Sequence, residues 1–202
     1  MTPSLFWSWF VDHSEALTML GDLTPAERAT LLDDMQRQLT AYCDGLTCEV
    51  SPAGPNGRTL TISAEGDIDL FRAVVALVEA APDVDWWEFV AFRQPQGTRL
   101  TVRFDRLRFD TARMWYQPLE CADRPDLLGL RVTLPPGLPV DADPDDIEVG
   151  VYVTLEALMG EVDCATLLGY VDTVPLPADP ATEGFQPLDT LPKMVSIWKE
   201  KA

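Results

Sequence analysis

Two glutamates in this 202-residue chain stand at positions where acid–base chemistry could be arranged. Glu65 lies in an expected strand-to-helix turn (SAEGD), and Glu161 follows a glycine that should end a helix (MGEVD). If both carboxylates met in one cleft beside Trp87, they could exchange protons with a bound ligand. The alternative is that both are ordinary acidic loop residues. The candidate binding residues are therefore Glu65, Trp87 and Glu161, and no residue is assigned a catalytic role.

The other residues that could carry chemistry form no recognisable set. The only histidine, His13, neighbours Asp12, but no motif links a nucleophile to it, so a structural role is favoured. The four cysteines show no CxxC or Cys/His spacing and predict neither a zinc site nor a disulfide framework. The aspartates of residues 141–146 resemble a calcium loop, but Asp146 replaces its glycine and Tyr152 its final glutamate. We expect no metal and no cofactor.

The stretch 60–94 must position Glu65 and Trp87, and its pattern predicts a strand, a turn, a helix and a second strand. Apolar and polar residues alternate at its start, as in a half-buried strand. Gly66 permits the turn, and Pro82 ends the helix because the residue before a proline avoids helical geometry. In the return strand, residues 86–92, alternation places Trp87 on one face and Trp86 on the other.

The helix expected over residues 67–81 carries the longest apolar stripe of the chain. Phe71, Val74, Val75 and Val78 share the spacing of one helix face. We therefore expect this helix at the centre of the core, with both central valines almost fully buried. Phe71 or Val78 should contact the 86–92 strand, and truncation of Phe71 to alanine should cost about 3–5 kcal/mol.

Further elements follow from caps and alternation. Residues 24–44 begin with a capping box and a proline, which indicates a helix. Residues 144–159 alternate like a strand, but the aspartates before them cap a helix, and the apolar stripe continues past the alternation, so we predict a helix. An aromatic-rich helix over 4–20 is expected to pack in the core, with a docking surface as the alternative. The remaining expectations are a helix over 190–200 and strands over 46–51, 58–63, 99–104, 114–119, 128–134 and 166–174, with a bulge or turn near Asp105.

This element order predicts an α+β fold with a mainly antiparallel sheet and helices packed on it. Residues 46–92 and 114–174 both follow the order strand, strand, helix, strand, which suggests a ββαβ pseudo-repeat and one extended sheet. We expect a single domain over residues 1–202. The proline- and aspartate-rich connection at 135–146 is the place for a sub-lobe boundary.

The formal charge of −18 is the strongest compositional signal. It argues against nucleic acid and anionic membranes as partners, and it would attract a basic protein. The plainer alternative is that the charge only keeps the protein soluble and monomeric. The N-terminus lacks the basic region of a signal peptide, and no apolar run reaches the length of a membrane span. A cytoplasmic location with reduced thiols is expected, and no oligomeric state is assigned.

Three segments resemble an uncharacterised bacterial domain family of unknown function: SAEGDIDLF, LVEAAPDVDWWEFVAFRQP and LEALMGEVD. The last segment has Met159 where the family has leucine. The resemblance covers roughly residues 5–175 and implies the same element order. It implies no activity.

Two functions are compatible with this sequence. The first is a non-enzymatic cytoplasmic binding protein whose acidic surface meets a basic protein, as an immunity-type protein does. The alternative is a small-ligand-binding protein or enzyme that uses carboxylates and tryptophans in a cleft, with Glu65, Trp87 and Glu161 around it. The absence of an assembled catalytic motif favours the first.

Overall fold

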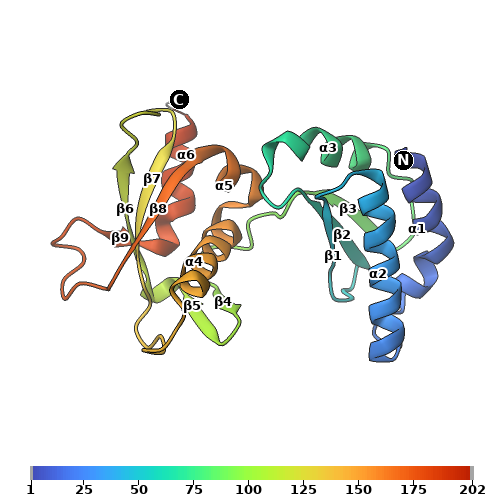
Figure 1. Ribbon diagram of the computed structural model, residues 1–202, viewed down its shortest axis with the longest axis horizontal. Coiled ribbons are helices and arrows are strands. Elements are labelled where there is room, and N and C mark those ends of the chain that lie inside the picture. The colour runs from blue at the N-terminus through green and yellow to red at the C-terminus, as the bar shows by residue number, and fades with distance from the viewer. Residues whose placement is uncertain (1, 201–202) are drawn as a thin grey trace. The chain divides into compact units, whose positions relative to one another are not determined.

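The computed structural model describes residues 2–200 and divides the chain into two compact units (Figure 1). Unit 1 ends at Arg93 and unit 2 begins at Gln94, and each has its own cluster of buried hydrophobic residues. The division thus differs from the candidate boundary at 135–146, which lies inside unit 2. That residues 1–202 form a single domain stays a prediction.

Over residues 2–93, unit 1 combines three α-helices with a three-stranded sheet. Thr24 caps the second helix through a capping box with Glu27, as its sequence predicts. In chain order, the elements are α1 (Pro3–Thr18), α2 (Pro25–Tyr42), β1 (Thr47–Val50), β2 (Arg58–Ser63), the short 3₁₀ helix η1 (Ile68–Leu70), α3 (Phe71–Glu79) and β3 (Trp87–Ala91).

The core of unit 1 is built from one face of this sheet and the three helices. Leu60 and Ile62 of β2 are fully buried and Thr61 between them is half-buried, which confirms the predicted alternation there, but Ser63 is fully buried as well. The aromatic residues of α1 belong to the same cluster, so the core position is confirmed for Phe6, Trp7 and Phe10.

Helix α3 contributes three of the four residues of its expected face to this core: Val74 is fully buried, as predicted, and Phe71 and Val78 pack against the cluster from half-buried positions. Val74 and Leu77 are fully buried, but Val75 is 39% exposed, so its predicted burial is wrong. Val75 lies about 100° around the helix from Val74, which turns it toward solvent. Phe71 is only half-buried, although its ring lies 4.6 Å from that of Phe92, which confirms the predicted contact.

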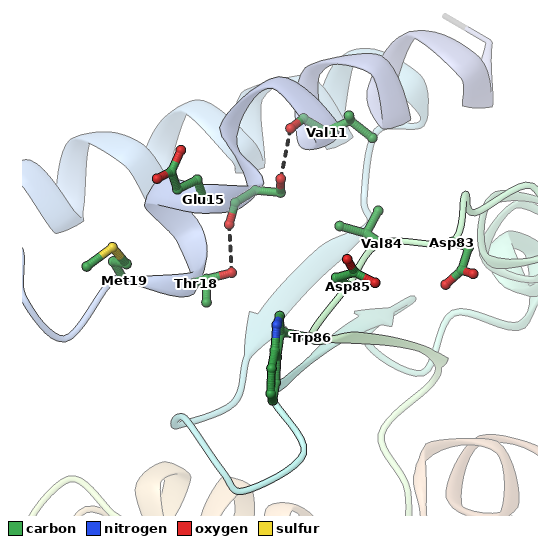
Figure 2. Close-up of a pocket in the computed structure, with 9 residues that line it drawn as sticks. Val11, Glu15, Thr18, Met19, Asp83, Val84, Asp85 and Trp86 are labelled. Carbon is green, nitrogen blue, oxygen red and sulfur yellow. Dashed lines mark hydrogen bonds between the residues drawn. The ribbon is translucent and has the colours of Figure 1, made fainter.

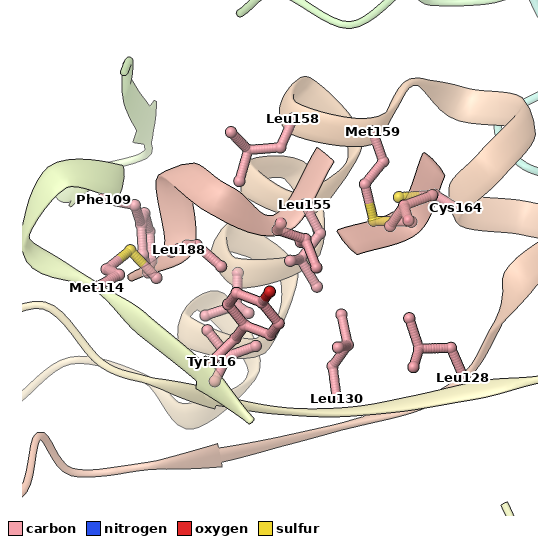
Figure 3. Packing of buried hydrophobic residues seen from close by; sticks show 14 of the residues in the cluster. Phe109, Met114, Tyr116, Leu128, Leu130, Leu155, Leu158, Met159, Cys164 and Leu188 are labelled. Atoms are coloured by element: carbon pink, nitrogen blue, oxygen red, sulfur yellow. The ribbon is translucent and has the colours of Figure 1, made fainter. Parts of the chain in front are cut away.

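In its described part, residues 94–200, unit 2 contains two further sheets and three α-helices. Its elements are β4 (Thr101–Phe104), β5 (Leu107–Asp110), η2 (Thr111–Arg113), β6 (Trp115–Glu120), β7 (Leu128–Thr133), α4 (Pro144–Met159), α5 (Glu161–Leu167), β8 (Leu168–Val174), β9 (Gln186–Pro187), η3 (Leu188–Thr190) and α6 (Leu191–Lys199). Figure 3 shows side chains of α4 pointing toward those of β6 and β7 in the core of this unit.

The helix predicted over 144–159 is confirmed in full. The Asp143 side chain accepts a hydrogen bond from the Asp145 N–H and so caps α4. Val151, Leu155 and Leu158 are buried at helical spacing, whereas Val149 and Val153 of the strand-like alternation are exposed. The cap and the helical stripe therefore outweigh the alternation.

Both units contain the same ββαβ connectivity. In unit 1, β2 pairs antiparallel with β1 and parallel with β3. In unit 2, β7 pairs antiparallel with β6 and parallel with β8, and the connecting segment carries α4 and α5. The predicted pseudo-repeat is therefore present at the level of topology.

The expected single extended sheet is not what forms, because the repeats build separate sheets. Residues 2–200 hold a three-stranded sheet (β1-β2-β3), a two-stranded sheet (β4-β5) and a four-stranded sheet (β8-β7-β6-β9). Asp105 adopts a left-handed φ of 48° between β4 and β5, which confirms the predicted turn there. Most of the pairings are antiparallel, as expected for this α+β fold. Within the described part of the chain, no helix is long and apolar enough to cross a membrane.

Candidate functional site

A groove of about 550 Å³ in unit 1 lies between α1 and the segment that leads into β3 (Figure 2). We call it the Trp86 groove. Helix α1 supplies one side of it and residues 83–86 supply the other. Its lining residues are Val11, Ser14, Glu15, Thr18, Met19, Asp83, Val84, Asp85 and Trp86.

The amphipathic pattern of α1 determines which residues reach the groove. Val11, Glu15 and Thr18 recur at helical spacing and share one side of the helix. Phe6, Phe10 and Leu17 lie on an adjacent face of the helix and enter the core, and Trp7, one turn before Val11, donates its indole N–H to the carbonyl of Leu77 at 2.8 Å. These core contacts orient the helix and leave Val11 and Glu15 exposed beside the groove.

Trp86 is the most unusual residue of the groove. Its side chain is 65% exposed, and its backbone has a left-handed φ of 67°, which is rare for a bulky residue. The turn before β2 fixes this conformation, because the Trp86 carbonyl accepts a hydrogen bond from the Arg58 N–H at 2.9 Å. A β-carbon on Gly57 would lie 2.0 Å from the same carbonyl oxygen, so Gly57 is needed for the backbones to approach.

The groove carries negative charge without compensation from its own lining. Glu15, Asp83 and Asp85 are exposed, and none of the three forms an ion pair with a residue in the range 2–200. None of the described residues that line the groove is basic. The nearby Arg58 donates instead to the carbonyls of Thr18 and Ser51, at 2.8 Å each.

Glu65, one of the predicted site residues, holds a different position and has basic and polar partners. Arg93 donates two hydrogen bonds to its carboxylate, at 2.6 and 2.9 Å, and Thr47 donates a further one. Arg93 also donates from Nε to Glu49 at 2.6 Å. This cluster lies past the carboxyl ends of β2 and β3, and Glu65 reaches it with a left-handed φ of 52°.

The partners of Glu65 decide what its carboxylate can do. The hydrogen bonds from Arg93 lower the pKa of Glu65, and they outweigh the opposing effect of burial. The same interaction raises the pKa of Arg93. A carboxylate with a lowered pKa is a weak base at neutral pH, so this arrangement suits an ion pair better than proton transfer.

The three predicted site residues occupy different places. Trp87 is half-buried against the core, where its indole N–H donates to Thr18 Oγ1 at 2.8 Å and its ring packs on Phe10. Trp87 pairs with Arg58 at the start of the parallel strands, whereas Glu65 lies past their other end, about 20 Å along the strand. Glu161 is fully buried in the first turn of α5 in unit 2. A cleft shared by these residues stays a prediction.

A second groove in unit 1 has a volume of about 860 Å³ and lies between α2 and the β1–β2 hairpin. Arg28 and Arg58 line it, but both donate to main-chain carbonyls. Cys48 also lines it, and burial raises the pKa of that thiol to about 12. The two arginines already hydrogen-bond within the fold, and the thiol has a raised pKa, so this groove is the weaker candidate for a functional site.

The remaining reactive residues have structural surroundings. The His13 ring stacks on Trp9 at 4.2 Å, and its Nδ1 lies 2.7 Å from the Trp9 carbonyl oxygen. All four cysteines are free, and residues 2–200 contain no cluster of three or more side chains suited to a metal ion.

Trp86 was not among the site residues predicted from the sequence, although it is the more exposed member of the Trp86–Trp87 pair. A signal was present, because Trp86 follows Asp83 and Asp85 and shares its expected strand face with Glu88.

Comparison with protein-family models finds no match to this chain, and comparison with curated proteins finds no relative.

Proposed function

We propose that this protein is a non-enzymatic cytoplasmic binding protein whose acidic surface engages a basic protein. The observation that carries the proposal is the Trp86 groove, where an exposed tryptophan stands among three carboxylates without an ion-pair partner in the described chain. Exposed tryptophan is typical of protein–protein contact centres, and the carboxylates favour a cationic partner.

The charge of unit 1 supports the same conclusion. Residues 1–93 include 15 acidic and 5 basic residues, a formal charge of −10. Arg28 and Arg58 donate to main-chain carbonyls, and Arg93 lies between Glu49 and Glu65. The acids outnumber these basic residues, so unit 1 stays strongly negative, although Arg58, which donates to the Thr18 carbonyl, offsets part of the field at that end of the groove. Such a field accelerates the encounter with a basic protein and repels nucleic acid.

An immunity-type role follows from this chemistry. A protein that must bind a basic toxin tightly gains from a strong negative field, which raises the association rate. It also gains from a rigid aromatic anchor, which costs little conformational entropy on binding. Both features are built into unit 1.

The test is capture of a partner followed by reconstitution. The tagged full-length chain is incubated with extract of its native cell, and a captured protein is then purified and titrated against it. We expect a basic partner whose affinity is at least about tenfold weaker in 1 M than in 0.1 M salt, since the Debye length falls from about 10 Å to about 3 Å. Failure to reconstitute binding with any basic partner, or an affinity indifferent to salt, contradicts the proposal.

A further inference from the structure

We propose that the Trp86 groove receives an arginine side chain of the basic partner, with the guanidinium stacked on the indole and paired with the groove carboxylates. This inference rests on the proposed function and specifies its contact. The features of the groove that support it are the exposed indole, the three acids and the apolar residues beside them.

The indole is presented in a fixed position. Gly57 and the Arg58 N–H hold the Trp86 peptide group, so the backbone from which the side chain projects is defined before any partner arrives. A left-handed φ is strained for a bulky residue and persists where the surroundings enforce it. The Gly57 turn enforces it here, and it leaves the indole mostly exposed.

The surroundings of the indole select a cation. A cation over the face of tryptophan is attracted by the ring quadrupole, and tryptophan is the best of the aromatic residues for this contact. Glu15, Asp83 and Asp85 add negative charge at the same groove, and no lining residue competes with an incoming cation. An anionic or purely apolar ligand would leave these carboxylates facing it without compensation.

Arginine fits this groove better than lysine. Its planar guanidinium stacks on an aromatic face and offers five N–H donors to carboxylates on either side. It is also less strongly hydrated than an ammonium group, so less solvation is lost on entering a groove. Val11 and Met19, both largely exposed at the rim, provide an apolar surface for its methylene stem.

The probe is an acetylated, amidated hexaarginine peptide titrated into the full-length protein by calorimetry in low salt. A hexacitrulline peptide of the same length is the uncharged control, and a hexalysine peptide tests the choice of cation. We expect hexaarginine to bind, hexacitrulline not to bind, and hexalysine to bind several-fold more weakly than hexaarginine.

Four variants locate the contact. Trp86→Ala should weaken hexaarginine binding about tenfold, and Trp86→Phe should lie between it and the wild type. A groove triple (E15Q, D83N, D85N) should weaken binding by more than about tenfold. The matched control is a triple in unit 2, D123N, E148Q and E183Q, which removes the same charge from exposed acids without ion pairs in the described chain. It should cost less than about threefold.

The outcomes separate this inference from the proposed function. Four results would overturn the proposal that the groove binds arginine. They are an equal loss of affinity in the two triples, no effect of Trp86→Ala, equal affinity for hexalysine and hexaarginine, and no preference for hexaarginine over hexacitrulline. A basic partner with salt-dependent binding would still support the proposed function. Circular dichroism of each variant establishes that it is folded, and Trp86→Phe keeps the test available if the alanine variant unfolds.

Discussion

Replacing Gly57 with alanine should destabilise unit 1 and displace Trp86 together. The φ of Gly57 is 103°, a conformation that costs an L-residue about 1–2 kcal/mol. The new β-carbon would lie 2.0 Å from the Trp86 carbonyl oxygen and 2.8 Å from its Cα, so one backbone must move. Such overpacking typically costs about 1–3 kcal/mol, and alanine recovers less than about 1 kcal/mol by restricting the unfolded chain. The expected net loss is about 2–4 kcal/mol.

The same turn offers a matched control. A β-carbon on Gly54 would meet its nearest neighbour, the Gly57 carbonyl oxygen, at 3.5 Å, which is ordinary contact. Gly54→Ala should therefore stay within about 0.5 kcal/mol of the wild type. Urea unfolding followed by circular dichroism, fitted with two transitions if the units unfold separately, measures both variants. Gly57→Ala should also weaken hexaarginine binding, because the indole loses its position. Equal stability of the two variants would refute the argument that Gly57 fixes Trp86.

Other predictions concern the core and the ionisable groups of unit 1. Leu77→Ala should cost about 2–5 kcal/mol in urea unfolding, whereas Val75→Ala should cost less than about 1 kcal/mol; the reverse order would mean that α3 packs with another face. Arg93 holds the pKa of Glu65 below 4.5. The ion pair therefore stabilises the folded state fully above that pH, and this stabilisation disappears as the pH falls through the lowered pKa. The stability advantage of the wild type over Glu65→Gln should therefore shrink below pH 4.5, and a constant difference would contradict the ion pair. Cys48, with a pKa of about 12, should resist iodoacetamide at pH 8 in the native protein and react once it is unfolded; rapid native labelling would show that it is accessible.

Local signals in the sequence predicted most of the elements. The capping box at Thr24 and the Asp143 cap each set a helix start, because the side chain satisfies backbone N–H groups that the helix leaves unpaired. The cap at Asp143 even overruled a strand-like alternation that ran through Val149 and Val153. Signals that act within a few residues were therefore reliable.

Signals that depend on tertiary packing were not. An apolar residue in a helix can face the core or its margin, and nothing local distinguished Val74 from Val75. Likewise, the ββαβ order was visible, but it could not show that the two repeats would build separate sheets.

The candidate site shows the same limit. The pairing of Glu65 with Arg93 joins residues 28 positions apart, across a helix and a strand, and no local pattern encodes it. The sequence places Trp86 directly after Asp83 and Asp85, which is a local sign of a surface position. Its left-handed backbone, however, depends on Gly57 in the β1–β2 hairpin, which only the fold brings next to it.

The most direct test of the central claim is the behaviour of the indole N–H resonances when hexaarginine is added. The chain has six tryptophans, and Trp86→Phe assigns the resonance that belongs to Trp86. Trp7, whose indole N–H donates to the Leu77 carbonyl inside the core, is the internal reference. We expect the Trp86 resonance to shift most and to give the same dissociation constant as calorimetry, while the Trp7 resonance stays in place. A Trp86 resonance that moves no more than that of Trp7 would contradict it.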